Sequence, residues 1–447
     1  MFATERKVAL FDIYPKIVPT RREVEFTLLM RDPHMLADIP CTLTVFAMNG
    51  GRNKPMIADL AYTRLEAPQS GFKFSLTLPS EQEYEIRIDF EEKKRPRGSI
   101  SIYALEDDLL YRTPLIGDFH AHTYFSDGGE GPAFVAAEYR KNGYDFATIT
   151  DHRRMQSSKL AVAALEDLKI PFKIYHGEEV HPYGIQQHVV NFAADDSINA
   201  YALQEKSLET WRDTAPTAEW TEEIKSVMAS LTDLPEDVDA QEVASAMIVA
   251  RRIREAGGMA ILAHPHWLWS VNNVTDPTTR YLLEHGIFDA LELIGGMKWY
   301  ENCTQIAFYE DLREQGIKTP VVGSSDMHTC LQKEFPTDRL AYFTEERTLV
   351  FAKSNTRDDI IAAVKDLYST TIYKHVGNYP RAEGGSYRLK LYATFLLRYY
   401  LPLRDELYLY EGNLLHDCVA GVAGAKEQLE AVAAYNTYFE KKYFYRP

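Results

Sequence analysis

Three side chains that can bind or orient a divalent cation occur two residues apart in the segment Asp118-Phe-His120-Ala-His122. Residues two apart in an extended chain project to the same side, so Asp118, His120 and His122 are expected to converge on one point. Two imidazoles aimed at one point suit a divalent ion, and a neighbouring carboxylate can fix an imidazole ring through its second nitrogen. The segment therefore predicts a metal site with Asp118 as an orienting group.

More side chains of the same types follow at intervals along the chain. They are Asp127, Asp151 and His152, the run His176-Gly-Glu178-Glu179-Val-His181, His188, His264-Pro-His266 and Asp326-Met-His328. Any one of these groups alone is more often a hydrogen-bonded surface or core pair than a set of ligands. Ten of the 13 histidines, however, lie between His120 and His328, and chemistry is expected in that window.

The elements that must position these groups are short apolar strands. Residues 144–150, 258–263, 288–294 and 319–323 form the clearest predicted strands, and residues 132–142 and 240–256 the clearest predicted helices. Alternating strands and helices predict an α/β domain with a parallel sheet, open or closed into a barrel. The candidate ligands follow apolar strands, where barrel enzymes carry their catalytic groups. Taken together, the pattern predicts metal binding far more strongly than any single pair.

Three other regions frame this domain of residues 114–375. Residues 1–110 alternate apolar and polar side chains in the runs 24–28, 42–46, 72–78, 84–90 and 99–103, which predicts a small β-sandwich. Residues 195–240 form a polar, helix-prone insertion of the kind that serves as a lid or specificity loop. Residues 376–447 predict helices that pack on the barrel or on a second subunit, so a homo-oligomer is one expected arrangement.

Composition excludes several classes of protein. The 447 residues have 45% hydrophobic and 26% charged side chains, which is typical of a folded protein with two or three domains. A formal charge of −16 argues against a surface that holds long DNA. The four cysteines form no CxxC pair, and no apolar stretch resembles a signal peptide or a membrane span, so a cytoplasmic location is expected.

The ordered motifs resemble those of the PHP (polymerase and histidinol phosphatase) superfamily. They are residues 117–128, Ile149-Thr-Asp-His152, Gly177-Glu-Glu179, Leu262-Ala-His-Pro265 and Ser325-Asp-Met-His328, and they span about 260 residues. A β-domain before the first motif is similar to the CehA/McbA-like branch of metallohydrolases. The resemblance implies a distorted TIM-like (β/α)7 barrel with three metal ions at the carboxyl ends of its strands.

The resemblance also implies how the ligands are shared. His120, His122, Glu179 and Asp326 would hold one ion, and Glu179 would bridge to a second ion completed by His188 and His264. Asp127, His152 and His328 would hold a third. Several relatives have histidine where this chain has Asp127, so two or three ions are expected.

Two ligand choices and three orienting roles stay open in the sequence. The resemblance favours Glu179 over Glu178, because the family spacing is Gly-x-Glu, and His188 over His181, because the following Val189-Val-Asn191 resembles the family's histidine-containing strand. Asp118, Asp151 and Glu292 are expected to orient ligands in the catalytic centre. For Glu292 the alternative is a buried carboxylate paired with a neighbouring cation. His266 is expected near the site, where it would contact substrate without binding metal.

The expected reaction is hydrolysis of a small phosphomonoester, a nucleotide or a short oligonucleotide. A metal cluster lowers the pKa of bound water until hydroxide is available, and imidazole-rich coordination without thiolates fits Zn, Mn or Fe. Three cationic side chains are candidates for binding the substrate anion, namely Arg153, Arg154 and Lys298. The alternative is that they are solvated loop residues without this role. Cleavage of a carbamate, ester or amide by the same cluster is a second hypothesis. A non-catalytic, metal-stabilised binding protein is a third.

Overall fold

The computed structural model describes residues 11–31, 39–51, 54–66, 68–91, 98–207, 210–330, 345–374 and 379–446. The chain divides into two compact units. One comprises chiefly Thr113–Leu397 and Leu401–Ala433, and we call it the α/β unit. The other comprises Ala3–Arg112 with the helix ends Arg398–Tyr400 and Ala434–Pro447, and we call it the β unit. The predicted boundary at residues 375–376 lies outside the described residues.

Two four-stranded sheets of the β unit share one apolar core. The first sheet has the order β1 (Phe11–Tyr14), β3 (Glu23–Met30), β6 (Gly71–Thr77) and β5 (Thr63–Arg64). The second has the order β2 (Ile17–Pro19), β8 (Gly98–Leu105), β7 (Gln82–Phe90) and β4 (Cys41–Ala47). Alternate residues face the core, as Val24, Phe26 and Leu28 do in β3. The alternating runs in the sequence therefore correctly predicted β3, β4, β6, β7 and β8. A short helix, α1 (Asp107–Leu110), follows β8.

The α/β unit contains two larger sheets. The six-stranded sheet has the order β11 (Lys173–Tyr175), β10 (Phe146–Thr148), β9 (Thr113–Asp118), β19 (Glu346–Ala352), β20 (Ser369–Tyr373) and β21 (Arg381–Glu383). The five-stranded sheet has the order β12 (Gly177–Val180), β13 (His188–Phe192), β16 (Met259–Ala263), β17 (Ala290–Ile294) and β18 (Val321–Gly323). A backbone bridge between His152 and Glu179 joins the sheets at one side, and the Ser369 hydroxyl donates to the Val321 carbonyl at the other.

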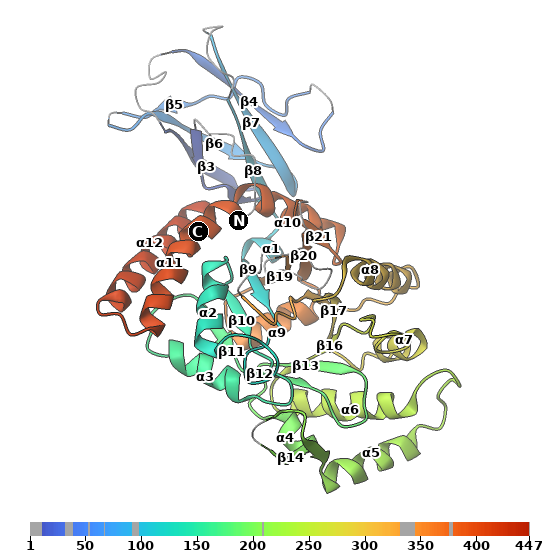
Figure 1. Ribbon diagram of the computed structural model, residues 1–447. Helices are drawn as coiled ribbons and strands as arrows, with labels where there is room; N and C mark the ends of the chain where they lie inside the picture. The colour runs from blue at the N-terminus through green and yellow to red at the C-terminus, as the bar shows by residue number, and fades with distance from the viewer. Residues whose placement is uncertain are drawn as a thin grey trace. The chain divides into compact units, whose positions relative to one another are not determined.

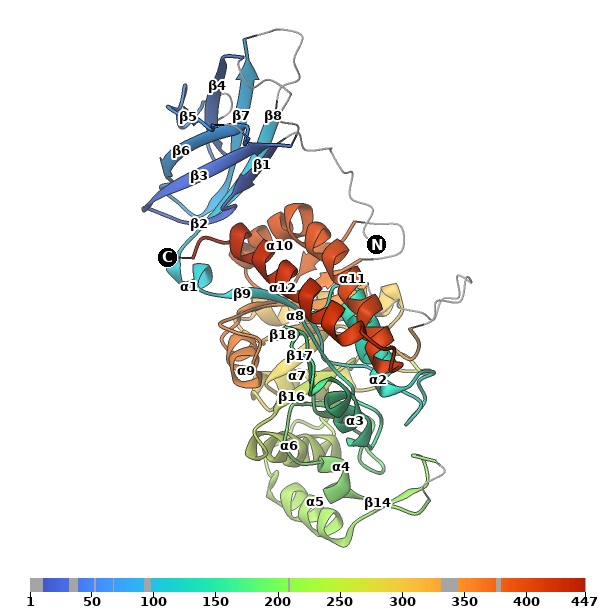
Figure 2. The ribbon, with the colours of Figure 1, turned by 90° about the vertical axis from the view of Figure 1, so that its left-hand side faces the viewer.

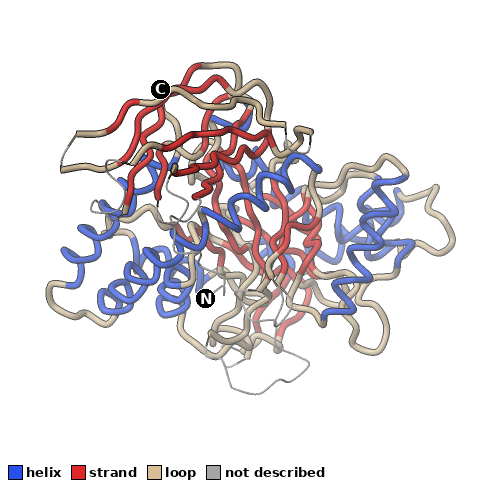
Figure 3. Tube along the Cα trace, turned by 90° about the horizontal axis from the view of Figure 1, so that it is seen from above, coloured by secondary structure: helices blue, strands red, loops and turns tan. Residues whose placement is uncertain are grey.

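Helices cover the outer faces of these strands (Figure 3). They are α2 (Pro132–Lys141), α3 (Gln156–Leu165), α6 (Ala240–Glu255), α7 (Asp276–Glu284), α8 (Trp299–Glu314), α9 (Arg357–Lys365) and α10 (Tyr387–Tyr399). The helix α11 (Leu401–Val419) packs on α2, and α12 (Ala425–Tyr443) follows it in the chain. Figure 1 shows α6 and α7 outside β16 and β17. Among the described residues, no helix combines the length and apolar character that crossing a membrane requires.

Strand alternation separates an inner from an outer apolar core. In β16, Ile261 and Ala263 join the inner cluster, which also receives residues of β9, β10 and β19, whereas Leu262 joins the outer cluster with α6 and α8. In β12, Glu179 and Val180 face opposite ways for the same reason, and Val180 packs in the outer cluster. The inner face of the strands therefore carries both the inner core and Glu179.

The strand and helix predictions in this unit are confirmed to within two residues at the clearest elements, but the strands are not all parallel. The pairs β12 with β13, β13 with β16, β9 with β19 and β19 with β20 are antiparallel. Between β12 and β13 the cause is the short connection 181–187, because a parallel crossover needs a dozen or more residues.

The insertion at residues 195–240 also differs from an all-helical segment. Between α4 (Ile198–Ala202) and α5 (Ala218–Ser230) it contains a hairpin of β14 (Leu203–Glu205) and β15 (Thr214–Pro216). In Figures 1 and 2 these elements lie together at one end of the α/β unit.

A buried ionic network ties α11 to α2 within the α/β unit. The Arg140 guanidinium donates to Glu411 through Nε at 2.6 Å, and both side chains are inaccessible to solvent. Arg404 of α11 donates through Nη1 to Asp145 at 2.7 Å, and Asp145 accepts from the Ile116 amide of β9. Buried charges need partners of opposite sign, so this network joins the C-terminal helices to the strand that precedes the first predicted motif.

Candidate metal centre

The Glu179 carboxylate lies at the middle of the histidine cluster and is fully buried. His188 Nδ1 is 2.6 Å from Oε1, and His152 Nδ1 is 2.6 Å from Oε2. Within the described part of the chain, neither these nitrogens nor the two carboxylate oxygens have a hydrogen-bond partner of normal geometry. Burying a carboxylate and imidazoles without hydrogen bonds costs free energy. A cation bound between them would remove this cost by interacting with both.

His120, His122 and Asp326 surround one side of Glu179. His120 Nε2 lies 3.5 Å from Glu179 Oε1 and 3.3 Å from Asp326 Oδ1. His122 Nε2 lies 3.5 Å from Glu179 Oε2 and 3.0 Å from Asp326 Oδ1. The Nε2 atoms of the two histidines are only 3.2 Å apart, so both lone pairs are available to one site when the rings are neutral.

Two further sets of side chains adjoin this one. Glu179, His188 and His264 have donor atoms within 4.8 Å of one another, and so do His122, Asp127, His152 and His328. His120, His264 and Glu292 form a fourth set by the same measure. All donors are imidazole nitrogens or carboxylate oxygens, which suit Zn, Mn or Fe. The side chains present therefore fit a cluster of divalent ions.

The backbone places these donors at strand ends. His120 and His122 follow β9, His152 follows β10, Glu179 lies in β12 and His188 begins β13. His264 follows β16, and Asp326 and His328 follow β18. His264 has φ of 26° and Asp326 has φ of 47°, values that non-glycine residues rarely adopt. Such strain persists where surrounding structure enforces it, and it concentrates at functional sites.

The three predicted orienting carboxylates have different partners. Glu292 Oε2 lies 3.0 Å from His120 Nδ1, which leaves Nε2 of that ring facing Asp326. Asp118 accepts hydrogen bonds from the Ser325 hydroxyl at 2.5 Å and the Tyr139 hydroxyl at 2.9 Å. It therefore links the end of β9 to the segment after β18. Burial raises the pKa of Asp118 to about 6, against the lowering effect of the Ser325 hydrogen bond.

Asp151 fixes the loop that carries Asp127. It accepts from the hydroxyls of Thr123 and Ser126, both at 2.6 Å, and from the Thr123 amide at 2.8 Å. Asp118 and Asp151 thus hold backbone segments in place, whereas Glu292 holds a histidine ring.

Glu178, the alternative to Glu179, faces a different neighbourhood. It accepts from the Ser197 hydroxyl at 2.6 Å, the Ile198 amide at 2.5 Å and the Asn199 side chain at 3.2 Å. These contacts anchor the start of α4. His181, the alternative to His188, lies beside His188 with ring centroids 4.2 Å apart, but it belongs to none of the four donor sets of the described residues.

Charge coupling is strong in the centre. Although burial opposes it, the imidazoles of His152 and His188 hold the pKa of Glu179 well below its usual range. Burial and, to a smaller extent, the neighbouring His328 together lower the pKa of His122 to about 4. Against the effect of burial, Asp326 raises the pKa of His328 to about 9. Although burial opposes it, neighbouring imidazoles also lower the pKa of Asp326 and of Asp127, so these two ligands and Glu179 are ionised across the neutral range, as ligands must be.

The predicted substrate-binding residues have protein partners. Arg153 donates through Nη1 to Thr214 Oγ1 at 2.8 Å and through Nε to the His181 carbonyl at 3.1 Å. Arg154 donates through Nε to Glu205 at 2.8 Å. His266 lies with Nδ1 3.2 Å from Gln305 and Nε2 3.2 Å from Asp276. Lys298 caps α8, and its ammonium lies 5.5 Å from the centre of the Tyr300 ring.

The sequence-based interpretation did not single out three side chains beside the donors. The Trp211 ring is stacked on His152 with centroids 4.5 Å apart, and Arg212 Nη2 is 4.0 Å from Asp127 Oδ2. The Trp267 ring lies 5.8 Å from that of His264. The sequence signal that could have identified Trp211 and Arg212 was their position side by side in the insertion, because insertions on barrels commonly contact substrate.

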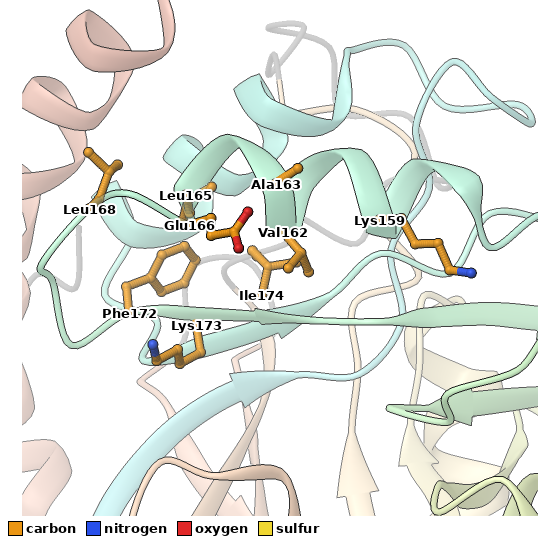
Figure 4. A pocket seen from close by; sticks show the side chains of 9 residues that line it. All are labelled: Lys159, Val162, Ala163, Leu165, Glu166, Leu168, Phe172, Lys173 and Ile174. Carbon is orange, nitrogen blue, oxygen red and sulfur yellow. The ribbon is translucent and has the colours of Figure 1, made fainter.

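A separate pocket lies between α3 and β11 (Figure 4). Its lining residues are Lys159, Val162, Ala163, Leu165, Glu166, Leu168, Phe172, Lys173 and Ile174. The donor side chains do not line it.

No family model and no curated protein matches the chain. Among solved structures, it is similar to a two-domain protein from Bacteroides vulgatus that contains a predicted PHP-like metal-dependent phosphoesterase. The alignment has 18% identity and a TM-score of 0.40, and it covers 59% of this chain and 66% of that one. It thus spans slightly less than two thirds of that protein.

Two further structures are similar to this chain. One is a protein from Bifidobacterium adolescentis proposed to be a metal-dependent phosphoesterase, with 19% identity, a TM-score of 0.34 and coverage of 56% of this chain and 94% of that one. The other is an amidohydrolase from Chromobacterium violaceum, with 18% identity, a TM-score of 0.32 and coverage of 50% and 89%. At these scores, the assignment of function below rests on the donor geometry of this chain.

Proposed function

We propose that the chain is a PHP-type metal-dependent hydrolase that cleaves a small phosphoester. The observation that carries this proposal is the buried Glu179 carboxylate, whose two oxygens face imidazoles from four segments of the chain, those of His120 and His122, His152, His188 and His264. A structural ion pair needs one partner for each charge, whereas this single carboxylate is surrounded by several imidazoles. That arrangement is typical of a bridging ligand in a cluster of ions.

The resident group of this centre is two or three divalent ions. His120, His122 and Glu179 would hold one together with Asp326, whose Oδ1 lies 3.3 Å and 3.0 Å from the two histidines, Glu179, His188 and His264 a second, and Asp127, His152 and His328 a third. When bound, such ions supply a Lewis acid that makes water acidic and withdraws charge from the oxygens of the group under attack. Glu292 keeps His120 Nε2 aimed at the centre, and Asp151 keeps the Asp127 loop beside His152.

The charge of the donors favours an anionic substrate. With three divalent ions bound, the centre holds six positive charges against the four negative charges of Asp127, Glu179, Glu292 and Asp326, and neutral imidazoles add none. A loaded centre is therefore cationic, and a cationic, largely buried site attracts phosphate oxygens more strongly than a neutral carbonyl. For this reason phosphoesters are proposed as substrates in preference to carbamates, esters and amides.

The fold proposed with this function is a distorted (β/α)7 barrel with a β-sandwich before it. Joining of the two sheets at both sides of the α/β unit supports the barrel, and the shared core of the two sheets in the β unit supports the sandwich. Homo-oligomer formation and a cytoplasmic location remain expectations from the sequence.

The test combines elemental analysis with a substrate panel. Purified protein should contain Zn, Mn or Fe, and it should hydrolyse p-nitrophenyl phosphate or a nucleotide faster than p-nitrophenyl acetate. Glu179→Gln should abolish both metal content and activity, while the exposed Glu219→Gln on α5 should change neither. A metal-loaded protein that cleaves only acyl esters or amides would overturn the phosphoesterase proposal, and one that takes up no metal would overturn the hydrolase itself.

A further inference from the structure

The loop between β14 and β15 places an aromatic ring directly on one candidate ligand. The Trp211 ring is stacked on the His152 ring, with centroids 4.5 Å apart and an interplanar angle of 19°. His152 in turn faces both Glu179 and Asp127. Trp211 is thus part of the wall of the metal centre.

The hairpin is held there by the two arginines that follow His152. Arg154 binds Glu205 on β14 and the Phe125 carbonyl, and Arg153 binds Thr214 on β15 and the His181 carbonyl. The sequence predicted that these two guanidinium groups bind the substrate anion. In the structure they instead hold the hairpin against the strand end that carries His152. The cationic side chain that faces the candidate metal ligands lies in the hairpin itself.

That cation is Arg212. Its guanidinium carbon lies 4.4 Å from the centre of the Trp211 ring, and Nη2 lies 4.0 Å from Asp127 Oδ2. Its side chain is 69% exposed. Among the described residues, no other lysine or arginine lies within 4.0 Å of a carboxylate in the four donor sets. A guanidinium stacked on a ring keeps its edge free, and that edge matches a phosphate through two parallel hydrogen bonds.

We propose that Arg212, positioned by Trp211, binds the oxygens of a phosphate group seated at the Asp127 and His152 side of the centre. This assignment rests on the proposed function and narrows it to phosphomonoesters, whose terminal phosphate has oxygens free for both the ions and the guanidinium. Arg212 is therefore a specificity residue, and Trp211 is a positioning residue that acts through it.

The test measures binding of inorganic phosphate, the common product, to metal-loaded protein by calorimetry. Arg212→Gln should weaken phosphate binding by about 10- to 100-fold, the usual effect of losing a hydrogen bond to a charged group. Arg212→Lys should restore part of the loss, because it keeps the charge without the planar fork. Metal content should be the same in all these variants. The matched control is Lys206→Gln, which removes a positive charge from the same hairpin at an exposed position.

A double-mutant cycle separates positioning from general disruption of the site. Trp211→Ala should weaken phosphate binding in the native background but have little effect in the Arg212→Gln background, because both changes remove one interaction. Equal losses in the two backgrounds would show that Trp211 does not act through Arg212.

The outcomes distinguish this proposal from the proposed function. Unchanged phosphate affinity in Arg212→Gln, or a loss equal to that of Lys206→Gln, would overturn the role of Arg212 even if the protein is a phosphoesterase. A specific loss in a protein that hydrolyses no phosphoester would support the anion site and overturn the proposed reaction. Metal-loaded protein that binds no phosphate would overturn the anion site.

Discussion

His120 Nδ1 lies 3.0 Å from Glu292 Oε2, and both side chains are fully buried. The contact orients the ring so that Nε2 is turned toward Asp326 and Glu179, where its lone pair would be available to an ion bound between them. Since Glu292 lies in β17 and His120 follows β9, the contact also joins two strands of different sheets.

Removing this orienting carboxylate should weaken metal binding without abolishing it. Glu292→Gln is expected to lower metal affinity by about 10- to 100-fold, the usual effect of losing a group that orients a ligand. Competition with a chelator of known affinity measures the change. An affinity equal to that of the native protein would show that His120 is oriented by other contacts.

Glu178 and Glu179 should fail in different ways when each is changed to glutamine. Glu179→Gln should lose metal, whereas Glu178→Gln should retain metal and lose about 2 kcal/mol or more of unfolding free energy, because buried donors at the start of α4 lose a charged acceptor. Urea unfolding and elemental analysis of both variants check this crossed pattern. Metal loss in Glu178→Gln alone would reverse the assignment of the two residues.

The stability of the metal-free protein should depend on pH through His328. Asp326 raises the pKa of His328 to about 9 in the folded chain despite the opposing effect of burial, whereas the unfolded value is about 6.5. The stabilisation is therefore complete below about pH 6.5 and is lost as pH rises to about 9. His328→Asn should be less stable than the native protein at pH 6 and nearly equal to it at pH 9.5, as measured by thermal unfolding in a chelator. A difference in stability that stays constant with pH would contradict the pairing.

Metal should stabilise the fold, and more so at higher pH. Metal competes with protons for the imidazoles, so the rise in Tm on adding metal should grow between pH 6.5 and pH 9. A ligand at 100 times its Kd stabilises by about 2.7 kcal/mol, so the rise should also increase with metal concentration. Thermal scans over a metal titration test this, and a Tm independent of metal would count against the cluster.

The buried pair of Arg140 and Glu411 should matter for stability alone. Glu411→Ala removes the nearest carboxylate from the buried Arg140 guanidinium, leaving Asp145 at 3.7 Å, and should cost about 3 kcal/mol. The exposed Glu427→Ala on α12 is the matched control and should be nearly neutral. Urea midpoints compare the two variants, and similar midpoints would show that α11 is held to α2 by apolar packing instead.

Much of this architecture was predictable because the signals are local. Apolar runs followed by histidine or carboxylate predicted β9, β10, β16 and β18, and the structure brings the side chains after these strands to one place. Alternation predicted the strands of the β unit for the same reason, since it depends only on neighbours in the chain.

The partners of Arg153 and Arg154 could not be predicted, because Thr214 and Glu205 are more than 50 residues away along the chain. The direction of β13 and the hairpin in the insertion depend on chain connections and on pairing with distant segments. Arg212 belongs to no motif, and its place beside Trp211 in the insertion could not reveal its distance to Asp127.

The anchoring of the hairpin separates selectivity from catalysis. Glu205 and Thr214 attach the hairpin to Arg154 and Arg153, so the residues between them can be changed while these hydrogen bonds are kept. Exchanging that tip between related chains is thus a direct way to engineer new substrate preferences on an unaltered set of metal ligands. An exchange that also replaced Arg153 or Arg154 would remove the hydrogen bonds that hold the hairpin. The metal ligands would then no longer be unaffected by the change.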